Sequence, residues 1–370
     1  MSEIRVPFYN HLREYHKIKA EVDAIITNSF TADYFSICSK VIVFESRLAR
    51  YLGLRKCVTI DSSSDARGFA LKALDIGEGD EVITTMLPFS GTAEAVRLVG
   101  ATPIFVDCEP DAWTINPKLI EEKITPHTKA IFPTHTYGHP ADMSAISEIA
   151  KKHNLLVIED CDQAIGAYSD SFKIGELSDA VCVSHVAERN VSTSGDAGSV
   201  ATNREQLASA LCNIRNYGSL KYLEETRTRP AMVHSAIWRV KLKFIDEWST
   251  LRIARAREYT ELLADTGIRL PSERQRYHHV FSLYVIETQE RDDLQKFLKE
   301  RGIATMTNYP ADVLIEARFP DGPGDPNVNL PITEKHAARC LALPIYPELT
   351  SDEVKIVADA IKEWLATRRL

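Results

Sequence analysis

Two serines in the first part of the sequence stand where a bound anion would be stabilised. Ser63 and Ser64 follow the apolar run 56–60 and precede a helical pattern at 65–74. The first N–H groups of a helix have no partner within the helix, and the helix dipole favours negative charge there. Hydroxyls at this place suit an anionic ligand, although a serine-rich turn that only caps the helix has the same composition.

Acidic residues close another apolar run, 155–159. Asp160 comes directly after this run and is followed by a polar stretch that includes Gln163. A carboxylate at the end of a buried strand can pair with a protonated ring nitrogen of a bound molecule, or it can merely cap the helix that follows. The sequence alone leaves both interpretations open.

An aromatic residue and a histidine also lie just beyond apolar runs. Phe89 follows the run 81–85 and offers a ring face for stacking, whereas aromatic residues at such positions are also typical of a packed core. Ser184 and His185 end the run 180–184. His185 has the chemistry of a proton carrier near neutral pH, but a lone histidine here is more often a packed interior residue than a catalyst.

These residues need parallel strands to bring them together, because ligands of doubly wound sheets bind beyond the carboxyl ends of the strands. From about residue 55 to 205, short apolar runs alternate with helical patterns, which predicts an α/β fold with a mainly parallel sheet between two layers of helices. The candidate helices are 65–74, 91–99, 117–123 and 143–152. The candidate strands are 56–60, 81–85, 103–106, 129–133, 155–159, 180–184 and 198–202.

The pattern changes beyond Arg239. A long amphipathic helix is predicted over about 240–266, then a strand over 279–287, and then helices at 291–301 and 350–367. This arrangement predicts a small α+β domain. We therefore expect two domains: residues 1–245, which contain an N-terminal arm and the large domain, and residues 246–370, which form the small C-terminal domain.

The composition argues against several classes of function. The 370 residues carry a formal charge of −8 without a basic stripe, which disfavours nucleic-acid binding. No apolar run approaches the roughly 20 residues that span a bilayer, and the first residues lack the layout of a signal peptide, so we expect a cytoplasmic protein. The 7 cysteines are widely spaced without a Cys-x-x-Cys pair, which predicts reduced thiols and no metal site.

One motif gives these separate signals a common meaning. Residues 189–198 resemble the Lys-Asn-Leu-Gly-x-x-Gly-Asp-x-Gly segment of the sugar aminotransferases, the DegT/DnrJ/EryC1/StrS family of fold-type I pyridoxal phosphate enzymes. The resemblance extends over residues 8–360 and implies an obligate homodimer with a large sheet domain, here of seven strands, and a small C-terminal domain. The other segments that resemble the family are 77–83, 99–103, 106–107, 135–143, 215–219, 239–242 and 343–347.

The resemblance also implies a cofactor cradle. Phe89 corresponds to the aromatic residue that stacks on the pyridine ring, Asp160 to the carboxylate that keeps the ring nitrogen protonated, and Gln163 to the residue near the ring hydroxyl. The cofactor phosphate is expected at the serines and at one arginine of a segment that one subunit gives to the other. Those phosphate residues are Ser63, Ser64, Ser184 and Arg227.

The chain departs from the family at the reacting centre. Arg189 stands where the family has the lysine that forms the Schiff base, and Lys173 and Lys221 align with positions that the family does not use for it. Arginine remains protonated below a pH of about 12, so it is a poor nucleophile and a poor base. Other pocket positions differ too, which favours natural divergence over a single engineered change; they are Cys38, Ser39, 227–229, His234 and Asn308.

These departures leave several hypotheses. The protein can hold pyridoxamine or pyridoxal phosphate without a covalent bond and act on a nucleotide-linked keto sugar, as the related sugar 3-dehydratases do with a histidine at this position; His185 is then the nearby candidate base, beside Arg189. It can instead bind a phosphorylated or carboxylated ligand at Arg189 and Arg227 without any cofactor. The remaining alternatives are ordinary transaminase activity and a non-catalytic partner of an active homologue.

Overall fold

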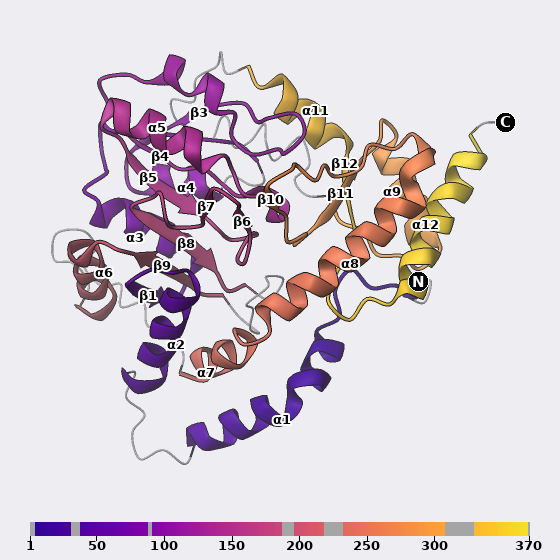
Figure 1. Ribbon diagram of the computed structural model, residues 1–370, viewed down its shortest axis with the longest axis horizontal. Helices are drawn as coiled ribbons and strands as arrows, with labels where there is room; N and C mark the ends of the chain where they lie inside the picture. The colour runs from indigo at the N-terminus through magenta and orange to yellow at the C-terminus, as the bar shows by residue number, and fades with distance from the viewer. Residues whose placement is uncertain are drawn as a thin grey trace.

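The computed structural model describes residues 4–30, 38–87, 91–186, 196–217, 232–307 and 329–368. One end of the molecule holds a helix-covered sheet, called here the sheet region (residues 38–217), and the other end holds the C-terminal region (residues 245–368). Helix α8 (Ile245–Leu263) runs from one to the other (Figure 1). Helices α1 (His11–Phe30) and α7 (Met232–Lys241) pack against each other along the lower edge in the same view.

The central sheet has seven strands in the order β1-β9-β8-β5-β4-β2-β3. Strand β9 is antiparallel to both of its neighbours, and every other pairing in the sheet is parallel. All seven strands predicted from the apolar runs are present, with small shifts at their ends, so the predicted mainly parallel sheet is confirmed. The strands are β1 (Lys56–Ile60), β2 (Glu81–Thr84), β3 (Thr102–Phe105), β4 (Thr128–Ile131), β5 (Leu156–Asp160), β8 (Ala180–Ser184) and β9 (Gly198–Thr202).

Helices cover both faces of this sheet because consecutive strand residues point to opposite sides. Val82 packs in a cluster with the first of two helical layers, while its neighbour Ile83 packs against the second. The first layer consists of α3 (Ser63–Ala73), α4 (Gly91–Leu98) and α6 (Glu205–Tyr217). The second consists of α5 (Met143–His153), α2 (Cys38–Tyr51) and α7.

Two predicted helices differ from the structure. Residues 117–123 form two 3-10 turns, η1 (Pro117–Leu119) and η2 (Glu121–Lys123), in which the N–H of Ile120 donates to the carbonyl of Pro117 at 3.2 Å and that of Lys123 to the carbonyl of Ile120 at 3.0 Å. The helix predicted over 240–266 is interrupted at residues 242–244 between α7 and α8, and it ends in η4 (Ala264–Thr266) at Gly267, whose φ is +77°. The apolar pattern continues through residues 242–244, so the sequence pattern could not show that the helix is interrupted there.

The C-terminal region is the expected α+β arrangement. Strands β11 (Tyr284–Glu287) and β12 (Cys340–Leu343) pair antiparallel, beside α9 (Arg291–Glu300), α11 (Pro331–Arg339) and α12 (Ser351–Ala366). Of the predicted strand at 279–287, only the second half is β11. Val6 packs into the core of this region, so the N-terminal part of the described chain contributes to it. A division at 245/246 stays a prediction.

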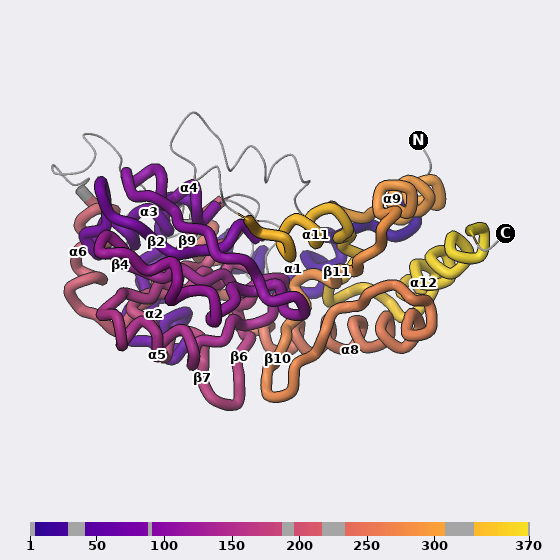
Figure 2. Tube along the Cα trace, turned by 90° about the horizontal axis from the view of Figure 1, so that it is seen from above, coloured from indigo at the N-terminus to yellow at the C-terminus, as the bar shows by residue number. Residues whose placement is uncertain are grey.

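A small three-stranded sheet projects from one side of the molecule in Figure 2. It consists of β6 (Tyr168–Ser169), β7 (Phe172–Lys173) and β10 (Tyr277–His278), and it connects the sheet region with the chain that leads into β11. Sequence patterns did not predict it because two-residue strands give no periodicity. In the residues described here, no helix is both long and apolar enough to cross a membrane.

Candidate active site

The first turn of α3 lies directly against the start of β9. Ser62 caps the helix and accepts a hydrogen bond from the N–H of Asp65 at 3.3 Å. A Cβ at Gly198 would lie only 2.6 Å from Cβ of Ala66 and 2.8 Å from Cα of Ser63. Only glycine therefore permits this close packing, which places Ser63 and Ser64 at the carboxyl end of β1, as the sequence predicted.

Acidic residues surround that helix start. The N–H of Ser63 donates to Oδ1 of Asp196 at 3.2 Å. Burial, followed by the charges of Asp196 and Asp61, raises the pKa of Asp65 above its ordinary value. An anion at this helix start would meet carboxylates in the described residues, so its binding requires cationic side chains in addition to the N–H groups and hydroxyls.

The end of β5 carries a buried charged cluster, the Arg67 triad, made of Arg67, Asp160 and Asp162. Arg67 comes from α3 and donates from Nε to Oδ2 of Asp160 at 3.0 Å, and from Nη2 to Asp162. Oδ2 of Asp160 also accepts from Oγ1 of Thr92 on α4 at 2.6 Å, and Oδ1 accepts from the N–H of Asp162 at 3.1 Å. All three charged side chains are at most 8% exposed.

Neighbouring charges and hydrogen bonds keep Asp160 and Arg67 ionised. Burial alone would raise the pKa of Asp160, but Arg67, the hydroxyl of Thr92 and the N–H of Asp162 outweigh it and hold that pKa below its ordinary value. Burial alone would lower the pKa of Arg67, and the two carboxylates raise it instead. One guanidinium therefore serves two carboxyl groups in the buried triad.

Gln163 is oriented by the backbone of a strained residue. Its Oε1 accepts from the N–H of Tyr137 at 2.8 Å, and Tyr137 has a φ of +57°, which is unusual for a side chain of this size. The hydroxyl of Tyr137 lies 3.0 Å from Nε2 of His336 on α11, and Nδ1 of His336 lies 2.6 Å from Oε1 of Glu287 on β11. Since the carboxylate accepts from Nδ1–H, Nε2 is the acceptor for Tyr137. A hydrogen-bonded path therefore joins Gln163 to the C-terminal region.

Ser184 ends β8 and His185 follows it, as predicted, but the surroundings of the two side chains differ. Oγ of Ser184 accepts from the N–H of Val186 at 3.3 Å, at the carboxyl edge of the sheet. His185 is fully buried, with its ring near those of Phe44 and Trp238 and its Nε2 at 2.8 Å from Oγ of Ser199. This is the setting of a packed interior histidine, and a catalytic role for His185 stays a prediction.

Several predicted residues lie outside the described part of the chain. They are Phe89, Arg189, Arg227 and Asn308. Of the other departures, Cys38 begins α2, and the ring of His234 on α7 lies 5.9 Å from that of Trp238. The described cysteines are free thiols, and the described residues contain no group of histidine, cysteine and acidic side chains placed to hold a metal ion.

Sequence reasoning missed Arg67. A signal was present, because Arg67 is the charged residue in a stretch of α3, from Ala66 to Leu71, that is otherwise apolar and wholly buried. Residues two apart in an extended segment share a face, so Asp160 and Asp162 are expected on one face. Two neighbouring carboxyl groups at the end of a buried strand indicate a nearby cation, because buried charges are almost always paired. Together these patterns predict a buried ion pair at the end of β5.

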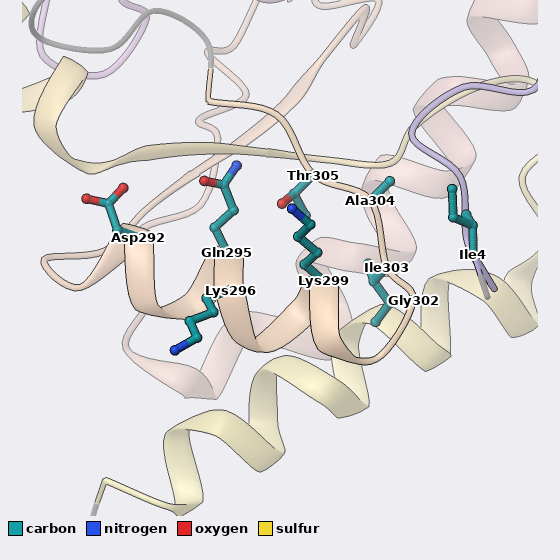
Figure 3. A pocket seen from close by; sticks show the side chains of 9 residues that line it. All are labelled: Ile4, Asp292, Gln295, Lys296, Lys299, Gly302, Ile303, Ala304 and Thr305. Carbon is teal, nitrogen blue, oxygen red and sulfur yellow. The ribbon is translucent and has the colours of Figure 1, made fainter. Parts of the chain in front are cut away.

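The open pocket in Figure 3 is elsewhere. It has a volume of about 650 Å³ and lies between Ile4 and α9 at the far end of the C-terminal region, lined by Gln295, Lys299 and residues 302–305. None of the predicted site residues borders it. The triad and the start of α3, rather than this pocket, hold the chemistry-bearing side chains.

Comparison with known proteins gives close relatives over nearly the whole chain. The sequence profile of the DegT/DnrJ/EryC1/StrS aminotransferase family matches residues 16–362. A dTDP-3-amino-3,4,6-trideoxy-alpha-D-glucose transaminase of Streptomyces venezuelae is 37% identical over 365 residues, which are 97% of this chain and 96% of that protein. A UDP-2-acetamido-2-deoxy-3-oxo-D-glucuronate aminotransferase of Pseudomonas aeruginosa is 32% identical over 360 residues, 96% of this chain and 99% of that protein.

Solved structures agree with these matches. S. venezuelae DesV superposes with a TM-score of 0.91 at 37% identity, covering 98% of this chain and 99% of that one. The structure of NtdA from Bacillus subtilis, which was solved with bound PMP, superposes with a TM-score of 0.88 at 29% identity, covering 99% of this chain and 86% of that one. The fold-type I aminotransferase architecture expected from the sequence is confirmed.

Proposed function

Because this chain belongs to the DegT/DnrJ/EryC1/StrS aminotransferase family, we propose that it acts on a nucleotide-linked keto sugar with pyridoxamine or pyridoxal phosphate held without a covalent bond. The observation that carries the proposal is Arg189, which stands where the family motif has its Schiff-base lysine, while Asp160 remains buried and ionised at the end of β5. In this proposal the cofactor cradle is kept and its covalent anchor is lost.

The described residues suit such a cofactor at its ring. Asp160 is ionised, and its Oδ1 accepts a single hydrogen bond, so it can accept another from a protonated ring nitrogen. Oε1 of Gln163 is already an acceptor for Tyr137, which leaves its amide N–H₂ to donate to a ring hydroxyl. Ser63, Ser64 and Ser184 would supply hydroxyls for a phosphate, and the acidic start of α3 supports the need for an additional cation such as Arg227.

The bound cofactor supplies an electron sink for charge that develops on the substrate carbon. The protein's part is to hold the ring nitrogen's proton at Asp160 and to orient the ring through Gln163. A lysine normally adds a nucleophilic amine and a mobile proton, and positioned proton transfer alone contributes about a hundredfold to ten-thousandfold. Since arginine provides neither, we expect ordinary transamination to be slow by at least that factor.

Substrate class and assembly complete the proposal. The named relatives act on dTDP- and UDP-linked sugars, which supports a nucleotide-linked sugar here and a role in the biosynthesis of an amino or deoxy sugar or a sugar-bearing secondary metabolite. We further propose a cytoplasmic homodimer with shared sites, because Arg227 corresponds to a segment that one subunit gives to the other. Light scattering on the purified protein would test the dimer: a monomer at micromolar concentration contradicts it.

The cofactor test uses the purified protein with pyridoxal phosphate or pyridoxamine phosphate. We expect saturable binding of both, release of all cofactor on denaturation, and no lysine-linked pyridoxyl peptide after borohydride reduction and mass mapping. The Arg189→Lys variant is the matched control and should yield such a peptide at residue 189. A lysine adduct in the unchanged protein would mean ordinary Schiff-base chemistry, and absence of binding would mean that the site works without this cofactor.

A further inference from the structure

The Arg67 triad places a cation on the carboxylate that would hold the cofactor's ring nitrogen. Both Nε of Arg67 and Oγ1 of Thr92 donate to Oδ2 of Asp160, at 3.0 and 2.6 Å. An oxygen of a carboxylate offers two lone pairs, so these two donors saturate Oδ2. The remaining acceptor capacity of Asp160 lies on Oδ1, which accepts from the N–H of Asp162.

The charge of Arg67 works against a second cation at Asp160. If Arg67 and Asp160 formed an isolated pair, their charges would cancel, and a protonated ring nitrogen would have no counter-charge in a buried site. Asp162 changes this balance because its carboxylate binds Nη2 of Arg67. The carboxyl group of Asp162 takes up part of the charge of Arg67, so Arg67 neutralises Asp160 less completely than an isolated partner would.

The other groups that face Asp160 do not alter this balance. Cys161 and Cys182 are fully buried, and burial, before the nearby carboxylates, raises the pKa of both thiols, so they stay neutral. Thr92 is neutral, and Nη1 of Arg67 donates to the carbonyl of Ser63 at 3.2 Å. The charge of Arg67 is the main charge that acts on Asp160, and Asp162 acts on Asp160 through its backbone N–H and through Arg67.

We infer that Arg67 and Asp162 form a matched pair of positioning residues that sets how firmly Asp160 holds the proton of a bound cofactor's ring nitrogen. This inference rests on the proposed function, because it requires the cofactor to bind. Arg67 weakens the hold and Asp162 restores part of it, so the ring nitrogen loses its proton at a lower pH than one held by a lone aspartate would. Neither residue is catalytic: both act through Asp160.

The experiment measures the ring nitrogen itself. The protein is saturated with pyridoxamine phosphate labelled with ¹⁵N in the ring, and the ¹⁵N chemical shift is followed against pH in the unchanged protein, Asp162→Asn and Arg67→Met/Asp162→Asn. Relative to the unchanged protein, the ring nitrogen should lose its proton about one pH unit lower in Asp162→Asn and about one to two units higher in the double variant, since a neighbouring charge shifts a pKa by that order.

A second buried pair supplies the matched control. Nη1 of Arg215 and the N–H of Thr59 both donate to Oε1 of Glu45 in the sheet region, away from Asp160. The Arg215→Met/Glu45→Gln variant also removes a buried pair, so it should lower the melting temperature without moving the ¹⁵N titration. The amide introduced by Asp162→Asn keeps an oxygen that can accept from Arg67, so the single variant is expected to fold even if the double variant does not.

The outcomes separate the inference from the proposed function. Identical ¹⁵N titrations in the unchanged protein and Asp162→Asn, with cofactor bound in both, overturn the inference and leave the proposed function intact. No binding of pyridoxamine phosphate to the unchanged protein overturns both. Binding only after Arg67 is removed also overturns the inference, because Arg67 would then exclude the ring rather than adjust its proton.

Discussion

Glu159 and Asp160 are neighbours at the end of β5, yet their carboxylates have different partners. Glu159 is fully buried, and its carboxylate has three hydrogen-bond partners: Nε2 of His135 at 2.8 Å, the N–H of Gly175 at 2.8 Å and the hydroxyl of Ser178. Asp160 points to the other face and is bound by Arg67 and Thr92, which come from helices. Glu159 holds residues 135, 175 and 178 against β5 through hydrogen bonds, whereas Asp160 is an ionised carboxylate at the carboxyl end of the strand.

The largest expected effect comes from removing the cation. Arg67→Met leaves two buried carboxylates without their partner, and breaking a buried ion pair in this way costs about 3–5 kcal/mol of the free energy of unfolding. Urea denaturation at pH 7 measures it. Asp162→Asn in the same protein should recover a substantial part of the loss; no recovery would mean that packing by Arg67, not charge, is what matters.

Arg67→Met should also change how stability depends on pH in the acid range. In the unchanged protein the folded-state pKa of Asp160 lies below its unfolded value of about 3.9, so its contribution is present above that pH and is lost as the pH falls through the folded pKa. In Arg67→Met, burial without the cation raises the folded pKa instead, so the variant should gain stability on acidification from pH 7 to 5. A parallel pH profile for both proteins would contradict the assigned charges.

Glu159→Ala should cost somewhat less, about 2–3 kcal/mol, because it leaves neutral donors unsatisfied rather than a charge unpaired. Thermal and urea unfolding measure the loss, and Glu122→Ala, an exposed glutamate, is the control. Cofactor affinity of the folded variant should stay unchanged. A weakened affinity for pyridoxamine phosphate at full folding would show that Glu159 also serves the site.

The smallest effects come from single neutral donors. Thr92→Val removes one donor to Asp160 and Ser178→Ala one donor to Glu159, and each should cost about 1 kcal/mol of stability. The two variants should differ in a second measurement: only Thr92→Val should move the ¹⁵N titration of bound pyridoxamine phosphate. If the ¹⁵N titration were the same in Thr92→Val and Ser178→Ala, the claim that Asp160 and not Glu159 acts on the ring nitrogen would be contradicted.

Sequence patterns predicted the parts of the molecule that depend on local order. Buried strands such as β5 and β8 are short apolar runs, and polar residues at their ends, such as Asp160 and Ser184, follow from the geometry of parallel sheets. The contact between Arg67 and Asp160 could not be found in this way, because the two residues are 93 positions apart in the sequence. The burial of His185 likewise depends on Phe44 and Trp238, which periodicity does not connect.

Tyr137 has a mechanical consequence for the site. Its N–H holds Gln163 while its hydroxyl is held by His336 on α11, and His336 is in turn anchored to Glu287 on β11. A rotation of the C-terminal region that pulled α11 away would act on a residue already at an unfavourable φ, which would relax toward a commoner backbone angle and release the amide of Gln163. In the proposed function, the hold of Gln163 on a bound ring would therefore depend on the docking of the C-terminal region.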